Sequence, residues 1–165
     1  MIAKKKEPSP TAELEKLCEE IAQEKADEKA LSVKQQKVYS GTRILTIYSD
    51  ASWCPNKKVG GWGSWMRFED TIHRAGGPLL AKTVLESSND AETAAAANAL
   101  SAAFHQGMLE QAKMIVFVID SLHAGGVING TINPSTDTQK MALAFIKKVA
   151  ASHGVSVKAN HVKGH

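Results

Sequence analysis

The chain has 165 residues, of which 43% are hydrophobic and 22% are charged, with a formal net charge of +3. This composition is typical of a globular domain large enough to bury a core. No apolar run approaches the roughly 20 residues of a transmembrane helix, and the N-terminal lysines are not followed by the apolar segment of a secretory signal. The sequence therefore excludes a membrane span and predicts a cytoplasmic protein, which we expect to be a monomer.

The positive charge is unevenly distributed along the chain. Residues 1–40 hold 8 lysines and 8 acidic residues, whereas residues 41–165 hold 12 basic and 9 acidic ones. If some of those nine acids share a metal site, the remaining surface is more basic than the total suggests. A basic surface of this kind favours a polyanionic partner.

The first 40 residues differ in composition from the rest and predict one short amphipathic helix. Ser9-Pro10 suits a helix cap and first position, and apolar side chains then recur at helical spacing. These side chains are Leu14, Leu17, Cys18 and Ile21. We expect residues 1–40 to form a partly helical appendage that either docks on the main domain or binds a protein partner.

The main domain, residues 41–165, begins with strand-forming sequence. Three segments combine β-branched and aromatic residues with alternating polarity. They cover residues 43–49, 61–68 and 71–79. A short turn at Glu69-Asp70 joins the last two, so these segments predict an antiparallel three-stranded meander.

The rest of the domain alternates helices and strands. We expect a helix over residues 90–105, at most a brief helix over 121–130, and a further helix that starts at 133–135 and stops at 154. Strands are expected over residues 113–119 and 155–162. Asn89 or Asp90 is expected to cap the first of these helices. The last helix should bury one stripe, formed by Met141, Ala142, Phe145, Ile146 and Val149. The whole order predicts an α/β fold: a five-stranded mixed sheet, its first three strands antiparallel, flanked by helices.

Three acidic residues occupy positions that suit a metal site. Asp50 is expected at the end of the first strand, Glu92 near a helix start, and Asp120 at the end of a central strand. Each one alone fits a helix cap or a surface charge equally well. Together they predict a centre for Mg²⁺ or Mn²⁺, because these hard cations prefer oxygen ligands and offset the repulsion between carboxylates. A pair of such ions is suited to phosphodiester hydrolysis.

Four short motifs around these acids follow one another in a fixed order. They are Asp-x-Ser at 50–52, Asn-x-x-Glu at 89–92, Asp-Ser at 120–121 and Val-Lys-Gly-His at 162–165. With Gly60-Gly61-Trp62-Gly63, this set resembles ribonuclease H of type 1. The resemblance covers about three quarters of the chain, from Arg43 onward. It implies the ribonuclease H-like fold and a two-metal endoribonuclease that cuts the RNA strand of RNA/DNA hybrids, leaving 5′-phosphates.

The resemblance also assigns roles to individual residues. It implies that Asp50, Glu92 and Asp120 bind the two ions, Asp50 bridging both, and that His165 assists proton movement or product release. Substrate contacts are implied or expected at Ser52, Trp53, Asn56, Ser87, Asn89 and Ser121. Among these, side-chain amides suit the 2′-hydroxyl groups that distinguish RNA from DNA.

The sequence also departs from the type 1 pattern. Members of that family carry a fourth acid on a helix after the Val-Lys-Gly-His motif, whereas this sequence stops at His165, so we expect a domain truncated after the fifth strand. Leu122 stands where members of the family often have a polar residue, and Asp90 stands where they often have a basic one. With one carboxylate fewer, one ion should bind more weakly. Two alternatives therefore remain: a module that binds hybrid or double-stranded RNA without cutting it, and another nuclease of the same superfold, such as a resolvase or transposase core.

Overall fold

The computed structural model describes residues 15–23, 43–79 and 84–164. The chain divides into two compact units, Met1–Thr42 and Arg43–His165. Among the described residues, no helix combines the length and the apolar character that a membrane crossing requires. The second unit contains every strand of the described chain and carries the predicted site.

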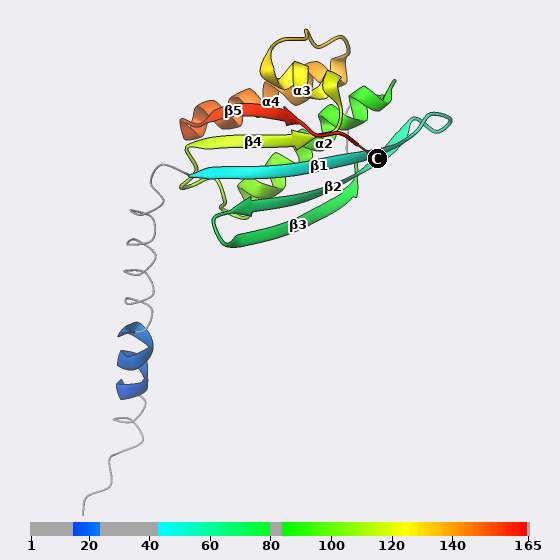
Figure 1. The fold of residues 1–165 in the computed structure, drawn as a ribbon. Coiled ribbons are helices and arrows are strands. Elements are labelled where there is room, and N and C mark those ends of the chain that lie inside the picture. Colours follow the sequence, from blue (N-terminus) through cyan, green and yellow to red (C-terminus); the bar gives the residue numbers. More distant parts are fainter. Residues whose placement is uncertain (1–14, 24–42, 80–83, 165) are drawn as a thin grey trace, which may run out of the picture. The chain divides into compact units, whose positions relative to one another are not determined.

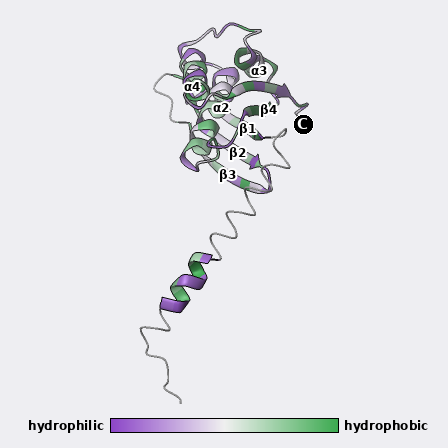
Figure 2. Ribbon diagram, turned by 90° about the vertical axis from the view of Figure 1, so that its left-hand side faces the viewer, coloured by the Kyte–Doolittle hydropathy of each residue, from purple (hydrophilic) through white to green (hydrophobic). Residues whose placement is uncertain are grey.

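The first unit contributes one described helix, over residues 15–23. Figure 2 shows hydrophobic and hydrophilic residues alternating along it. Its apolar side chains Leu17 and Ile21 are both exposed. The expected start of the helix at Ser9-Pro10, and Leu14, lie outside the described residues.

The second unit is built on a five-stranded mixed sheet (Figure 1). Its strands are β1 (Ile44–Cys54), β2 (Val59–Phe68), β3 (Thr71–Pro78), β4 (Met114–Ile119) and β5 (Ser156–His161). They lie in the order β3-β2-β1-β4-β5. Strand β2 is antiparallel to both β1 and β3, while β4 runs parallel to both β1 and β5. The predicted sheet is confirmed, including its antiparallel meander.

Three helices pack together on this sheet. They are α2 (Ser88–His105), α3 (Leu122–Asn129) and α4 (Asp137–His153). Helix α2 contacts β1 and β2, α3 contacts mainly β5, and α4 contacts mainly α2 (Figure 1). Ala95, Ala96, Ala99 and Ala103 of α2 are buried, and their small side chains let this helix lie close to the sheet. The element order confirms the predicted α/β fold.

The core lies between these helices and the sheet. Ile115, Phe117 and Ile119 of β4 are fully buried, and Leu45 and Ile47 of β1 join them in the same cluster. The alternate residues of β4 are only partly buried. Among the described residues, helices therefore cover only one face of β4.

Helix α4 differs from its predicted form in two ways. It begins at Asp137 rather than at 133–135, because the Thr136 side chain caps it by accepting a hydrogen bond from the Gln139 amide. The predicted stripe is buried at Ala142, Ile146 and Val149 but not at its other two positions. Met141 and Phe145 are 45% and 36% exposed, because α4 packs chiefly against the single helix α2 and buries only a narrow strip.

Gly126 on α3 provides a test of this packing. A Cβ atom at this position would lie 2.5 Å from Cδ1 of Ile132. Alanine gains about 1 kcal/mol of helix propensity over glycine, but overpacking costs about 1–3 kcal/mol. We therefore expect Gly126→Ala to lower the free energy of unfolding by up to about 2 kcal/mol in urea titrations.

The neighbouring Gly125 provides the matched control for this substitution. Its Cβ would meet Cβ of Ala159 at 3.8 Å, an ordinary contact. Gly125→Ala should therefore leave the stability unchanged or raise it by up to about 1 kcal/mol. Equal effects of the two substitutions would contradict the close packing of α3 against Ile132.

Candidate metal centre

Asp50 lies inside β1, four residues before the strand ends at Cys54, so the prediction that it ends the strand is wrong. The reason is that β1 keeps pairing with β2 as far as Cys54, opposite Val59. Its pairing with β4, in contrast, stops at Tyr48. Beyond Tyr48 the β4-facing edge of β1 has no paired strand among the described residues, which leaves room for a site beside Asp50.

Glu92 reaches this space from α2. Ser87 caps the helix by accepting a hydrogen bond from the Asp90 amide at 3.2 Å, so the expected caps, Asn89 and Asp90, are wrong. Glu92 then falls in the second turn of α2. Because α2 packs on β1, this turn brings the Glu92 carboxylate to Asp50.

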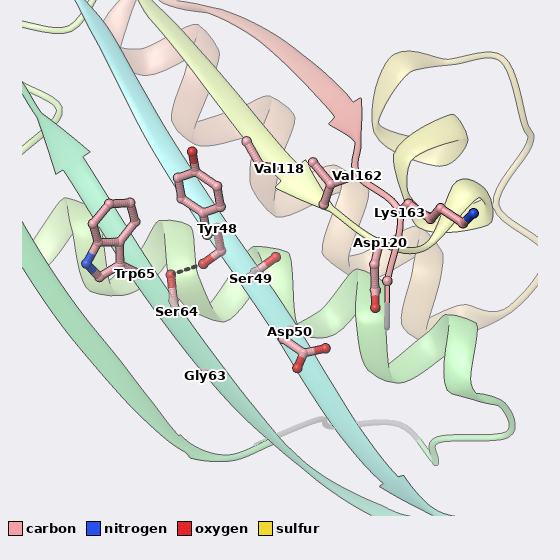
Figure 3. A pocket seen from close by; sticks show the side chains of 11 residues that line it. Tyr48, Ser49, Asp50, Gly63, Ser64, Trp65, Val118, Asp120, Val162 and Lys163 are labelled. Atoms are coloured by element: carbon pink, nitrogen blue, oxygen red, sulfur yellow. Dashed lines mark hydrogen bonds between the residues drawn. The ribbon is translucent and has the colours of Figure 1, made fainter.

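Asp120 follows directly after β4, as predicted. The next residue, Ser121, caps α3 by accepting a hydrogen bond from the Ala124 amide at 3.1 Å. The chain therefore turns away from the sheet immediately after Asp120. Figure 3 shows the Asp120 side chain close to Asp50, at the end of β4.

The three carboxylates converge. One oxygen each from Asp50, Glu92 and Asp120 lie within 4.8 Å of one another. Asp50 and Asp120 are exposed, whereas Glu92 is partly buried and its Oε2 atom is buried without a hydrogen-bond partner. These crowded carboxylates, one of which has a buried oxygen without a protein donor, fit a hard divalent cation.

Crowding also changes the acidity of the site. The pKa of Glu92 is raised from 4.5 to about 7, first by burial and then by the negative charges of Asp120 and Asp50. The backbone amide of Ala51 acts in the opposite direction. A bound cation would favour the ionised form of Glu92, so metal binding should displace its proton.

An open groove of about 400 Å³ adjoins Asp50 and Asp120. Figure 3 shows it on the sheet, with Tyr48 and Trp65 at one end and Lys163 near Asp120. The Tyr48 and Trp65 rings are 5.0 Å apart. Trp62, in contrast, packs against the buried core.

The chain returns to Asp120 through its last described residues. A Cβ atom at Gly164 would lie 2.9 Å from Oδ2 of Asp120, so only glycine lets the backbone approach this closely. A ring nitrogen of His161 lies 3.0 Å from the backbone carbonyl oxygen of Asp120. Sequence reasoning missed this contact, because nothing local to His161 indicates that it faces Asp120. His165, the predicted assisting histidine, lies outside the described residues.

Two of the predicted substrate-binding residues lie together beside the acids. The Ser121 hydroxyl donates a hydrogen bond to Oδ1 of Asn89 at 3.5 Å. Asn89 is partly buried in the first turn of α2, and Ser121 is the neighbour of Asp120. The structure therefore places this pair next to the carboxylate cluster.

The other predicted contacts are more scattered. Ser52 accepts a hydrogen bond from the Gly61 amide at 3.3 Å, within the β1–β2 hairpin. Asn56 is exposed in the turn of this hairpin, residues 55–58. Trp53 lies in β1 rather than in a loop, because the hairpin pairing extends past it, and it packs against a cluster around Leu85.

Comparisons with known proteins agree with this geometry. The model of the RNase H family matches residues 42–165. A search of curated proteins found no match. Among solved structures, RNase H1 from the halophilic archaeon Halobacterium salinarum NRC-1 is 18% identical, with a TM-score of 0.57, over 73% of this chain and 86% of that chain.

Two further solved structures are similar to this chain. The N-terminal RNase H domain of rv2228c from Mycobacterium tuberculosis, solved as a fusion with maltose binding protein, is 15% identical with a TM-score of 0.58, over 73% of this chain and 88% of that chain. LC11-RNase H1, solved in complex with an RNA/DNA hybrid, is 19% identical with a TM-score of 0.60, over 72% of this chain and 85% of that chain.

The strand order and these structural matches define a ribonuclease H-like domain. The family match covers well over half of the sequence. The chain belongs to the ribonuclease H family, and the predicted resemblance to its type 1 members is confirmed.

Proposed function

We propose that this protein is a divalent-metal-dependent endoribonuclease that hydrolyses the RNA strand of RNA/DNA hybrids. The observation that carries the proposal is the convergence of Asp50, Glu92 and Asp120 within 4.8 Å, in a chain of the ribonuclease H family. The hybrid bound to the similar LC11-RNase H1 supports the choice of substrate.

In this proposal Asp50, Glu92 and Asp120 would hold two Mg²⁺ or Mn²⁺ ions, with Asp50 contributing to the binding of both and each of the other two acids to the binding of one. When bound, such an ion pair would supply activation of the attacking water near neutral pH and stabilisation of the departing oxygen of the phosphodiester. The protein needs no nucleophile of its own, and its side chains position the substrate.

The residues around the acids supply these positioning contacts. We propose that Asn89, Asn56 and Ser121 hydrogen-bond the minor groove of the hybrid, where amide and hydroxyl groups can pair with 2′-hydroxyls. Lys163, beside Asp120 in the groove, is placed to attract a phosphate. His165 is proposed to assist product release or proton movement.

Three further side chains complete the proposed substrate surface. Ser87 accepts a hydrogen bond as the α2 cap, and its hydroxyl proton remains available for a phosphate of the DNA strand. Ser52 stiffens the hairpin that carries Asn56. Trp53 is partly buried against the Leu85 cluster, so only its exposed part is free to contact a base.

A cleavage assay tests the proposed function. The purified protein should cut the labelled RNA strand of a hybrid in Mg²⁺ or Mn²⁺, leaving 5′-phosphates, and should stop cutting when a chelator is added. Double-stranded DNA, double-stranded RNA and single-stranded RNA of the same sequence are the control substrates. Binding of hybrid or double-stranded RNA without cleavage would instead support the non-cutting module. Preferential cleavage of DNA junctions would support another nuclease of the superfold.

A further inference from the structure

Asp90 is a buried acid that the proposed chemistry does not use. It is fully buried in the first turn of α2. Its carboxylate accepts three hydrogen bonds: from the Glu86 amide at 2.9 Å, from the Thr136 hydroxyl at 2.7 Å and from Nε2 of Gln139 at 2.9 Å. Two of these donors belong to the start of α4. The carboxylate of Asp90 therefore ties the first turn of α2 to the first turn of α4.

The same network continues to α3. Gln139 is almost completely buried, and its Oε1 atom accepts a hydrogen bond from the Ser135 amide at 3.0 Å and lies 3.1 Å from Nε2 of His123. Since the amide nitrogen of Gln139 donates to Asp90, Oε1 must be an acceptor, which assigns the proton to Nε2 of His123. His123 is the second residue of α3. The first turns of all three helices that cover the sheet are thus joined by one chain of hydrogen bonds.

Two of these helix starts carry metal-site residues. Glu92 follows Asp90 by two positions on α2, and Asp120 precedes the Ser121 cap of α3. Before a cation binds, the carboxylates of Asp50, Glu92 and Asp120 repel one another within 4.8 Å. This repulsion would favour a movement of the first turns of α2 away from β1, and the hydrogen bonds from Thr136 and Gln139 to Asp90 would resist it by holding α2 to α4.

We propose that Asp90 is a positioning residue of the metal centre, which holds the start of α2 so that Glu92 stays with Asp50 and Asp120. The inference rests on the proposed function, because it assumes that these acids bind cations. It goes further in assigning a task to a residue that touches neither metal nor substrate. Groups that orient metal ligands from a distance commonly change metal affinity when they are replaced.

The substitution Asp90→Asn tests the proposal, because it keeps the size of the side chain. It replaces one carboxylate oxygen, which accepts a hydrogen bond from Gln139 or Glu86, with an NH₂ group that can only donate. We expect Mn²⁺ affinity, measured by titration calorimetry well below the melting temperature, to fall on the order of tenfold. The Mn²⁺ concentration that gives half-maximal hybrid cleavage should rise by the same factor. At saturating Mn²⁺, KM for the hybrid should stay unchanged.

Asp137→Asn is the matched control. Asp137 lies in the first turn of α4 and carries the same charge as Asp90, but its side chain is exposed. Its substitution should leave Mn²⁺ affinity unchanged. Gln139→Met serves as a second variant if Asp90→Asn does not fold, since it removes one donor to Asp90 and the link to His123 while keeping the volume; we expect it to weaken Mn²⁺ binding several-fold.

The outcomes separate this inference from the proposed function. A folded Asp90→Asn or Gln139→Met protein with a lower melting temperature but unchanged Mn²⁺ affinity would show a purely structural role and overturn the inference, whether or not the wild type cuts hybrids. If the wild type binds Mn²⁺ but cuts no hybrid, the proposed function fails, and weaker Mn²⁺ binding by the Asp90 variant still supports the positioning role.

Discussion

Replacing Asp50 with asparagine is expected to lower the rate of hybrid hydrolysis by roughly 10³-fold or more, because the cations supply several kcal/mol of charge stabilisation. The neutral amide binds a hard cation far more weakly than a carboxylate. Asp50 lies in the paired strand β1, so its backbone is held in place by β2 whichever side chain it carries. The loss should therefore appear in kcat and in Mn²⁺ affinity, measured by single-turnover cleavage and titration calorimetry, with little change in melting temperature.

Asp70→Asn is the control for this substitution. Asp70 is exposed in the turn between β2 and β3, so its substitution removes the same charge away from the carboxylate cluster. We expect this variant to cut the hybrid at the wild-type rate. Activity of Asp50→Asn within a few-fold of the wild type would contradict the assignment of Asp50 as a metal ligand.

The raised pKa of Glu92 predicts that the free energy of unfolding of the metal-free protein depends on pH. The folded state keeps this proton up to about pH 7, whereas the unfolded chain releases it near pH 4.5. Between these values the folded state binds more protons, so this group makes stability fall as pH rises. In Glu92→Gln the effect is removed. With a chelator present at pH 8, the variant should exceed the wild type by about 1–2 kcal/mol in urea unfolding, after allowance for solvent screening.

Divalent cations should make the wild type more stable than Glu92→Gln, the reverse of the order expected without metal. With Mn²⁺ at pH 8, the wild type gains stability from binding in its folded state, whereas Glu92→Gln gains much less. Comparing the variant with the wild type at each pH cancels the titration of the histidines, which both proteins share. Glu110→Gln, which neutralises an exposed acid, should show neither effect. Equal stability of the wild type and Glu92→Gln at pH 5 and at pH 8 without metal would contradict the crowded acidic centre.

Much of this architecture could be predicted because the relevant signals are local. Alternating polarity, helix spacing and glycine stops are read within a few residues, and they predicted the order of strands and helices correctly. The positions of two acids could also be predicted from local signals. Glu92 lies near the start of a helix and Asp120 directly after the end of a strand. Asp50 was expected at the end of the first strand, but β1 runs on to Cys54, and it is the β1–β4 pairing that stops just before Asp50.

The rest depends on pairings between distant segments. Helical spacing shows that Met141 and Phe145 could be buried, but only the packing of α4 on α2 decides that they are exposed. The length of the β1–β2 hairpin similarly decides that Trp53 belongs to a strand. Asp90 is hydrogen-bonded to Thr136 and Gln139, which follow it in the sequence by 46 and 49 positions. No local sequence pattern links residues that far apart.

The most direct test of the metal centre is a crystal structure of the protein soaked in Mn²⁺, with anomalous diffraction measured to locate the ions. We expect manganese peaks bonded to carboxylate oxygens of Asp50, Glu92 and Asp120, and the loss of these peaks in Asp50→Asn crystals treated in the same way. Fully soaked crystals with no manganese at these three side chains, or with the three carboxylates turned away from one another, would contradict it.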